Sequence, residues 1–306
     1  MNLSFKHISL GLLLSLSAQA SFAQIIVQDS RGEQTLENTP KKVVALNWDL
    51  AEQVLELGVT PVGVPNIKDY HEWVVQPQIP ESVVDLGTRA EPNLSEIAKL
   101  KPDVILAANP QKDLIAKLET IAPVLYYQSY SPNQNHAQEA ITNFKNIAQL
   151  LDKTDVAEQK LAQMQTRFGE LKAQLTKAYG DELPSVVAMR FASESAVWLY
   201  TKNSTTTYAL EQIGLTPALT PAEQEWGISQ QPIQSLKDLT DAYVVYFGPL
   251  DSKDKLEKSM LWNAMPFVRQ KHANEADAVW NYGGAMSIQY IAESVTKSLL
   301  ELKSQE

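Results

Sequence analysis

Short apolar runs alternate with segments of helical periodicity along the first half of the chain. Residues 41–46 (KKVVAL) predict a buried strand, and the segment after them predicts a helix that stops at Gly58. The same order returns at 94–107, where Pro102 ends a helix ahead of the apolar run 104–107. Strands that alternate with helices in this way indicate a parallel sheet covered on both faces.

The second half of the chain echoes this plan. The segment 57–61 (LGVTP) has a counterpart at 213–217 (IGLTP), and residues 232–247 predict another helix followed by the strand 243–247. The spacing between matching segments differs, which indicates two lobes of similar architecture and not a tight repeat.

A single long helix is predicted between the two halves. Apolar side chains recur at helical spacing from Val156 to Leu175, Thr154 or Asp155 is expected to cap the start, and Gly180 closes the element. About 25 residues make a rod of roughly 37 Å, enough to cross from one lobe to the other. A stiff helix is a poor hinge, so we expect only modest closure between the lobes.

The predicted fold is therefore two α/β lobes with mainly parallel sheets, joined by one long α-helix, with a ligand cleft between the lobes. The expected limits are a signal peptide at 1–23, an N-terminal lobe at 24–152, the linking helix at 153–180 and a C-terminal lobe at 181–306.

The first residues have the layout of a secretory signal peptide. Lys6 and His7 precede a mostly apolar run at 8–16, and small residues end at Ala23, the expected cleavage position. The run is shorter than the roughly 20 apolar residues of a membrane anchor, and the chain has no cysteine to carry a lipid. We therefore expect a soluble protein of the periplasm, without a lipid anchor.

Composition narrows the classes of partner and chemistry. The formal net charge of −10 argues against nucleic acid, because phosphate binding needs clustered lysine and arginine. The sequence contains no GxSxG, HExxH, GxxxxGK[ST] or GxGxxG motif, and His71, His136 and His272 occur in three different settings. We therefore expect no catalytic residue, no protein-ligated metal and no enzyme activity.

Aromatic residues stand where a ligand is expected in such a fold. Ligands of doubly wound sheets bind outside the carboxyl ends of the strands. A single tryptophan is most often core, but a group of aromatic residues in polar or loop-like settings suggests a ligand or partner surface. These residues are Trp48, Trp73, Trp226, Trp280 and Tyr282. The apolar neighbours of Trp198 and Trp262 predict that these two belong to the core.

Several stretches together resemble the ferric hydroxamate-binding proteins of ABC importers, in the long-helix class of siderophore- and cobalamin-binding proteins. They are KVVALNWDLAEQVLELGVTPVGV, WVVQPQIPESVVDLGTRAEPNLSEI, Trp226-Gly227, LWNAMPFVRQ and AVWNYGG. The resemblance covers roughly residues 38–300. DLGTRAEPN and LWNAMPFVR are specific to this branch, whereas KPDVIL is common to the wider class.

This resemblance implies a solute-binding protein that captures a ferric siderophore, with hydroxamates favoured, and delivers it to an inner-membrane ABC permease and its ATPase. By local match, Arg89 would contact the hydroxamate oxygens, and the aromatic residues above, from Trp48 to Tyr282, would line the pocket. The family can carry a pocket tyrosine after the KPDVIL strand. Here Asn109 and Gln111 stand instead, which leaves the natural siderophore open.

The chemistry of the residues agrees with the resemblance. A ferric siderophore already surrounds its iron with oxygens, so the protein needs no cofactor and no metal ligand, only an aromatic cleft and a few hydrogen-bond donors. Arginine suits that task, because its planar fork reaches two oxygens at once. Only Arg89 and Arg190 are expected to face the cleft. Such sparse positive charge favours a near-neutral hydroxamate complex over a highly charged catecholate complex.

Alternatives stay open at this point. The ligand could be another iron chelate, such as a mixed catecholate or carboxylate siderophore or haem, or it could be cobalamin. A remote alternative from another class is a periplasmic enzyme that processes siderophores. The resemblance also implies acidic residues that dock each lobe on the permease, for which Glu96 and, less directly, Glu211 are the candidates. We expect a monomer.

Overall fold

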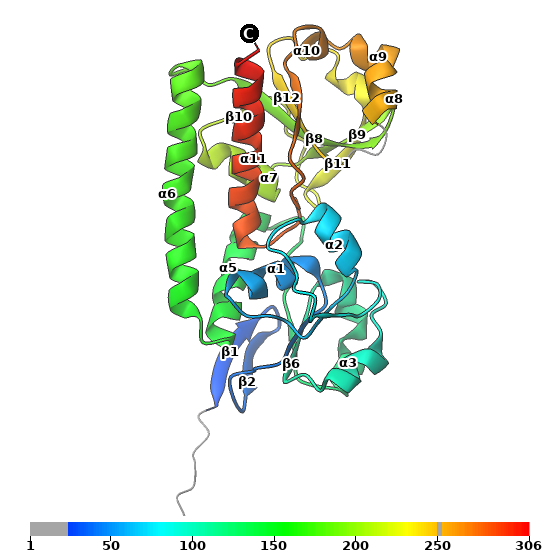
Figure 1. The fold of residues 1–306 in the computed structure, drawn as a ribbon, viewed down its shortest axis with the longest axis vertical. Helices are drawn as coiled ribbons and strands as arrows, with labels where there is room; N and C mark the ends of the chain where they lie inside the picture. The colour runs from blue at the N-terminus through cyan, green and yellow to red at the C-terminus, as the bar shows by residue number, and fades with distance from the viewer. Residues whose placement is uncertain (1–23, 250–252, 306) are drawn as a thin grey trace, which may run out of the picture.

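The computed structural model describes residues 24–249 and 253–305. The expected signal peptide, 1–23, lies outside the described residues. The described chain forms two α/β lobes, one above the other in Figure 1, with long helices along one side of both.

The N-terminal lobe is built on a sheet of five parallel strands in the order β5-β4-β3-β6-β7. Its strands are β3 (Val43–Ala45), β4 (Gly63–Val64), β5 (Val84–Asp85), β6 (Val104–Ala107) and β7 (Val124–Tyr126). Its helical segments are α1 (Trp48–Glu56), α2 (Ile67–Trp73), α3 (Leu94–Leu100), η1 (Asn109–Leu114), α4 (Ile115–Leu118) and α5 (His136–Leu150). The predicted parallel sheet, with an apolar strand at 104–107, is confirmed in this lobe.

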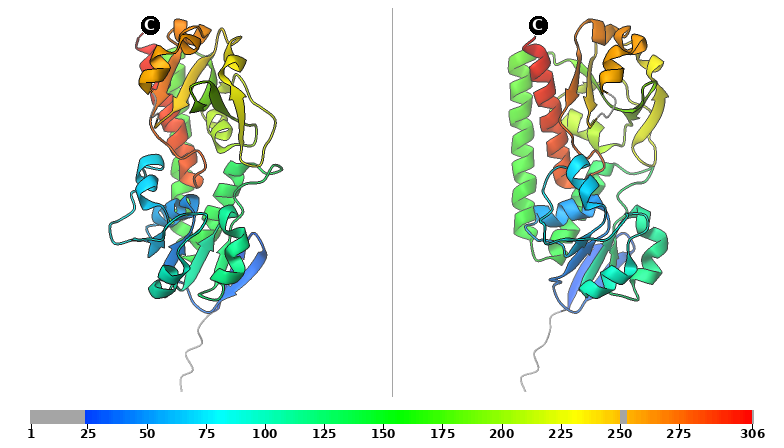
Figure 2. Two further views of the ribbon diagram at one scale, coloured as in Figure 1. Left: turned by 90° about the vertical axis from the view of Figure 1, so that its right-hand side faces the viewer. Right: turned by 45° about the vertical axis from the view of Figure 1, so that its right-hand side comes forward.

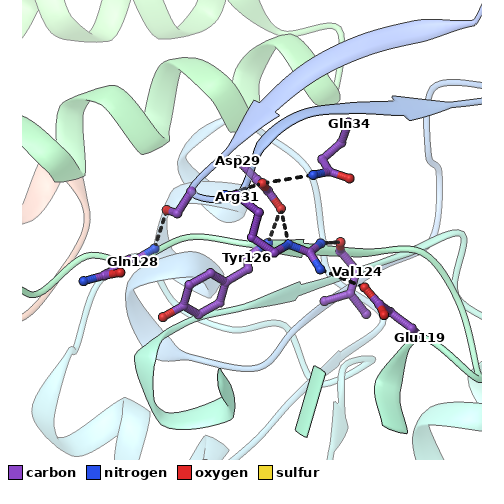
Figure 3. A network of polar contacts seen from close by, with 8 residues as sticks. Asp29, Arg31, Gln34, Glu119, Val124, Tyr126 and Gln128 are labelled. Carbon is purple, nitrogen blue, oxygen red and sulfur yellow. Dashed lines mark hydrogen bonds and ion pairs between the residues drawn. The ribbon is translucent and has the colours of Figure 1, made fainter. Parts of the chain in front are cut away.

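A hairpin of β1 (Ile25–Asp29) and β2 (Gly32–Leu36) is attached to this sheet by a polar network (Figure 3). The buried carboxylate of Asp29 accepts a hydrogen bond from the backbone of Tyr126 at 2.9 Å and pairs with Arg31 at 3.0 Å. Arg31 also pairs with Glu119 at 2.7 Å and donates to the carbonyl of Val124. The hairpin is therefore fixed beside β7 and away from the other lobe.

The C-terminal lobe has a six-stranded mixed sheet with the main order β11-β9-β8-β12-β13, and β10 also pairs with β8. Its strands are β8 (Ser185–Ser193), β9 (Ala196–Tyr200), β10 (Thr216–Pro217), β11 (Ile228–Pro232), β12 (Tyr243–Phe247) and β13 (Ala273–Ala276). The pairs of β8 with β10 and β12, and of β12 with β13, are parallel, as predicted. The pairs β8–β9 and β9–β11 are antiparallel. For β8–β9 this follows from the connection, because two residues are too few for a parallel crossover.

The remaining helical segments of this half differ from the prediction at one place. They are α7 (Thr205–Gln212), η2 (Ile233–Leu236), α8 (Lys253–Lys258), α9 (Met260–Asn263), α10 (Pro266–Arg269) and α11 (Ala285–Lys303). The helix expected before β12 is only the 3₁₀ turn η2, so that prediction was wrong. Ile233, Leu236 and Leu239 recur every third residue, the spacing that a 3₁₀ turn places on one face.

The predicted long helix is α6 (Thr154–Tyr179), and it ends at Gly180, whose φ of 88° is unfavourable for residues with a Cβ. Its N-cap is Lys153, without a side-chain hydrogen bond, so the caps expected at Thr154 or Asp155 were wrong. Figures 1 and 2 show α11 beside α6, so the helix that joins the two lobes packs against a second long helix. The lobe limits 24–152, 153–180 and 181–306 stay a prediction.

No helix within the described ranges combines the length and the apolar character needed to cross a membrane.

Candidate ligand-binding site

Two adjoining cavities lie between the lobes, at the carboxyl ends of strands from both sheets. One has a volume of about 230 Å³ and the other of about 400 Å³. Arg89 and Trp280 line both cavities, so they stand at the boundary of one divided cleft. Sites for small organic ligands usually measure roughly 300–1,000 Å³, so a siderophore-sized ligand would need both parts.

Trp48 forms part of the wall on the N-terminal side. It is the first residue of α1, placed at the cleft because β3 ends just before it. Its indole nitrogen donates to the carbonyl of Pro65 at 3.0 Å, and the side chain is only 2% exposed. Its ring meets the ring of Trp280, from the other lobe, edge-on at a centroid distance of 4.9 Å.

Arg89 lies directly over Trp48. Its guanidinium carbon is 3.7 Å from the centroid of the Trp48 ring and 5.4 Å from that of Trp280. Burial lowers the pKa of Arg89, while the nearby carboxylates of Asp49 and Asp69 act in the opposite direction. Within the described parts of the chain, this guanidinium forms no ion pair and no hydrogen bond. Its donors are therefore available to a ligand.

Arg190 supplies a second cation from the C-terminal lobe. It stands near the end of β8, with its guanidinium carbon 5.7 Å from the ring centroid of Trp73 and 5.8 Å from that of Tyr282. Among the described residues it has no ion-pair partner. The divided cleft therefore carries one guanidinium from each lobe, and each is held against aromatic rings.

An aromatic cluster closes the smaller cavity. Trp226 is 43% exposed, and its ring lies 5.4 Å from that of Tyr130 at an interplanar angle of 30°. The hydroxyl of Tyr130 donates to the backbone carbonyl of Tyr282, which joins the two lobes at this point. Burial raises the pKa of both tyrosines, so their phenols stay protonated and can act as donors.

Most of the predicted site residues are therefore found together, but two are not. Arg89, Arg190, Trp48, Trp73, Trp226, Trp280 and Tyr282 line one cavity or both. Gln111 is fully buried, with its side chain bonded to the backbone of Ala108 at 3.0 Å and of Arg89 at 2.6 Å. Asn109 binds the backbone of Ser129 and Tyr130. Both side chains are turned toward the backbone and line neither cavity.

The structure corrects two further expectations about the tryptophans. Trp198 is half-buried in β9 and lines the larger cavity, so its assignment to the core was wrong. Of the aromatic residues expected in polar or loop-like settings, Trp73 instead ends helix α2, while Trp226 lies just before the strand β11. Trp262 is 5% exposed and packs against Phe267 in the core, as predicted.

Sequence reasoning missed several residues of the cleft. They are Asn47, Asp69, Pro110, Tyr130, Phe191, Ala192, Trp198 and Ile228. Tyr130 could have been predicted from the sequence, because it is an aromatic residue a few positions after the strand β7, as Trp48 is after β3. Trp198 was predicted to belong to the core, and the others are residue types that are common in ordinary loops, strands or helices.

The described residues include no group of three or more histidine, cysteine, aspartate or glutamate side chains that could hold a metal ion. The cleft instead offers guanidinium donors and flat apolar rings. Such an arrangement can bind the organic shell of a small complex.

The predicted docking residues lie outside the cleft. Glu96, in the first turn of α3, pairs with Lys99 at 2.6 Å. Glu211 is exposed on α7.

Two α/β lobes on a long helix, with a cleft made by both, define a binding protein for a small ligand. The chain belongs to the periplasmic binding protein family, whose sequence pattern matches residues 43–279. The resemblance found in the sequence is thereby confirmed at the level of the family.

Individual relatives carry the comparison further. The chain is 55% identical to the siderophore binding protein FhuD from Vibrio cholerae, whose crystal structure contains Fe³⁺-Desferal; the TM-score is 0.85, over 86% of this chain and 98% of that one. It is 29% identical over 265 residues to the iron(3+)-hydroxamate-binding protein FhuD of Escherichia coli (strain K12), covering 85% of this chain and 87% of that protein. It is also 30% identical over 282 residues to the Fe(3+)-citrate-binding protein YfmC of Bacillus subtilis (strain 168), covering 90% and 85%.

Proposed function

We propose that this protein captures a ferric hydroxamate siderophore between its lobes and presents it to an inner-membrane ABC permease for iron uptake. The observation that carries the proposal is the divided cleft, in which Arg89 and Arg190 face a ligand space among aromatic rings. The 55% identity to a protein crystallised with Fe³⁺-Desferal supports the same ligand class.

The cleft chemistry fits a complex whose iron is already enclosed. A ferric hydroxamate exposes oxygens that accept hydrogen bonds, and a guanidinium can donate to two of them. The apolar parts of the siderophore would lie against Trp280 and Tyr282, from which they displace water. Because the complex is near neutral, two cations suffice. The iron is cargo, so no residue is assigned as a metal ligand, a cofactor site or a catalytic group.

Ferric citrate is the second candidate, because the chain is 30% identical to an Fe(3+)-citrate-binding protein over 90% of its length. A citrate complex carries more negative charge than a hydroxamate complex and would depend more strongly on Arg89 and Arg190. The salt dependence of binding separates the two ligands, since charge attraction is screened and ring contacts are not.

Tryptophan fluorescence tests the proposal directly. Trp48, Trp73, Trp226 and Trp280 surround the ligand space, so a bound ferric complex would quench their emission. We expect saturable quenching at micromolar or lower concentrations of ferric hydroxamates, and weaker or no quenching with ferric citrate or a ferric catecholate. If only ferric citrate or only a ferric catecholate quenched the emission, that complex would replace the hydroxamate as the assigned ligand. If no iron complex quenched the emission, the proposal would be refuted.

The location and the partners belong to the same proposal. Residues 1–23 would direct export and be removed after Ala23, so that the mature protein is released into the periplasm. We expect the mature protein to be a monomer. The chain has no cysteine, the residue that carries the lipid of a lipoprotein. Glu96 and Glu211 would meet basic residues of the permease, whose ATPase drives transport. Charge reversal at either glutamate should reduce siderophore uptake but not siderophore binding, and undiminished uptake would remove that glutamate from the docking surface.

A further inference from the structure

The aromatic walls of the cleft are connected by a buried carboxyl group that lies outside the ligand space. Glu52 is on α1, one helical turn after Trp48, and its side chain is completely buried. Its carboxyl oxygens accept hydrogen bonds from the backbone nitrogens of Gly284 at 3.0 Å and Ser287 at 2.9 Å. The hydroxyl of Ser287 donates to the same carboxyl group at 2.7 Å.

These partners form the N-terminus of α11. The first backbone N–H groups of a helix have no partner within the helix and are usually satisfied by the side chain of the N-cap residue. The N-cap of α11 is Gly284, which has no side chain to do this. Glu52, from the other lobe, takes over the role of the cap. Figure 1 shows the start of α11 directly above α1.

The two glycines of the sequence WNYGG allow this contact. A Cβ on Gly283 would lie 1.9 Å from the Ser287 hydroxyl and 2.5 Å from a carboxyl oxygen of Glu52. A Cβ on Gly284 would lie 2.3 Å from Cγ of Gln53, the neighbour of Glu52 on α1. A side chain at either position would therefore displace Ser287 and Glu52, or Gln53, and disturb the contact between α1 and α11.

The same contact determines where the cleft wall stands. Trp280 and Tyr282 directly precede the two glycines, and the Gly283 nitrogen donates to the carbonyl of Trp280 at 3.0 Å. Helix α1 therefore begins with Trp48 and, through Glu52, also fixes the segment that carries Trp280. The two indole rings that meet at 4.9 Å across the cleft are linked through this carboxyl group.

We propose that Glu52 is a positioning residue of the cleft: by capping α11 from the opposite lobe, its carboxyl group holds Trp280 against Trp48 before any ligand arrives. The cleft is thereby preorganised, and the lobes are joined beside the ligand space as well as along α6. This inference rests on the proposed function only where ligand affinity is concerned, because the position of the rings is a property of the ligand-free protein.

The variant Glu52→Gln tests the proposal. Glutamine has nearly the same shape, but its amide nitrogen cannot accept a hydrogen bond from a backbone N–H group. Each carboxyl oxygen of Glu52 can accept one whether the group is protonated or ionised. Two indole rings in contact couple their electronic transitions and give a couplet in the circular dichroism spectrum. We expect this couplet to weaken in the ligand-free variant. The dissociation constant for a ferric hydroxamate should rise about tenfold, since the variant loses the preorientation of about one or two side chains.

The matched control is Glu56→Gln, one turn further along α1. Glu56 accepts a hydrogen bond from Tyr290, on α11, and pairs with Lys160, on α6, at 2.6 Å. Glu56→Gln therefore weakens other contacts of α1 with these two helices but leaves the cap of α11 in place. Both variants should lower the urea midpoint of unfolding, but only Glu52→Gln should change the couplet and the affinity. Gly284→Ala, which pushes Gln53 away while leaving Glu52 intact, should reproduce the spectral change and serves if Glu52→Gln does not fold.

The outcomes separate this inference from the proposed function. An unchanged couplet in both Glu52→Gln and Gly284→Ala overturns the positioning role, whatever the ligand. A changed couplet in a protein that binds no iron complex leaves the positioning role in place and refutes the proposed function alone. An equal loss of affinity in Glu52→Gln and Glu56→Gln would show a general effect of stability and would also overturn the inference.

Discussion

Replacement of Arg89 by alanine should weaken siderophore binding strongly while leaving the fold intact. The guanidinium lies 3.7 Å from the Trp48 ring and, among the described residues, has no acceptor, so a ligand oxygen would be its partner. A hydrogen bond to a charged group contributes about 1.5–3 kcal/mol. The dissociation constant should therefore rise about 10- to 150-fold. Arg89→Lys keeps the charge but loses the planar fork, so its affinity should be intermediate between that of the original protein and that of Arg89→Ala.

Isothermal titration with a ferric hydroxamate measures the effect, and urea unfolding shows whether the fold is retained. The control is Arg167→Ala. Arg167 lies on α6 and pairs with Glu170 at 2.9 Å and Glu293 at 2.7 Å, away from the cleft, so its loss should leave the affinity unchanged. A dissociation constant within twofold of the original in Arg89→Ala would refute the assignment of Arg89 as the polar anchor.

Three further effects follow from the same contacts. Tyr130→Phe removes the hydrogen bond to Tyr282 and should lower the free energy of unfolding by about 1 kcal/mol, whereas an unchanged urea midpoint would contradict that contact. Gln111→Ala removes the hydrogen bond to the backbone carbonyl of Arg89 and should weaken siderophore binding, though less than Arg89→Ala does. Full affinity in a calorimetric titration would show that Gln111 does not help to position Arg89. Burial raises the pKa of Glu52 to about 8 from 4.5, with Glu56 adding to the rise and hydrogen bonds from Ser287 and Gly284 opposing it. The native state therefore keeps this proton at pH values where the unfolded chain has lost it. The free energy of unfolding should fall as pH rises from 4.5 to 8, by up to about 1.4 kcal/mol per pH unit, and urea titrations of Glu52→Gln should lack that slope.

Local patterns in the sequence were sufficient for the elements whose partners are adjacent in the chain. The apolar run at 104–107 and the long periodic segment ending at Gly180 were predicted, because hydrophobic spacing and a terminating glycine are local properties. The antiparallel half of the second sheet was not predicted. It depends on the two-residue connection between β8 and β9, inside a stretch that has no glycine or proline to mark a turn.

The sequence predicted those site residues that follow an apolar run closely, but not the orientation of every side chain. Trp48 and Arg190 could be found because Trp48 closely follows the apolar run that forms β3 and Arg190 directly follows the apolar run 186–189 of β8. Trp198 was missed because apolar neighbours hide the fact that one face of β9 borders the cleft. Asn109 and Gln111 were placed at the correct strand end. The direction of their side chains is set by hydrogen bonds to the backbone of Tyr130 and Arg89, more than 20 residues away, and of Ala108, in the preceding turn, and the spacing of residues does not predict such contacts.

A crystal structure of the protein with a ferric hydroxamate tests the central claim most directly. The account predicts the complex between the lobes, with siderophore oxygens within hydrogen-bonding distance of Arg89 and aromatic rings against its organic shell. All ligands of the iron should come from the siderophore. A protein atom bonded to iron, or a complex bound away from the space between Arg89 and Arg190, would contradict the account.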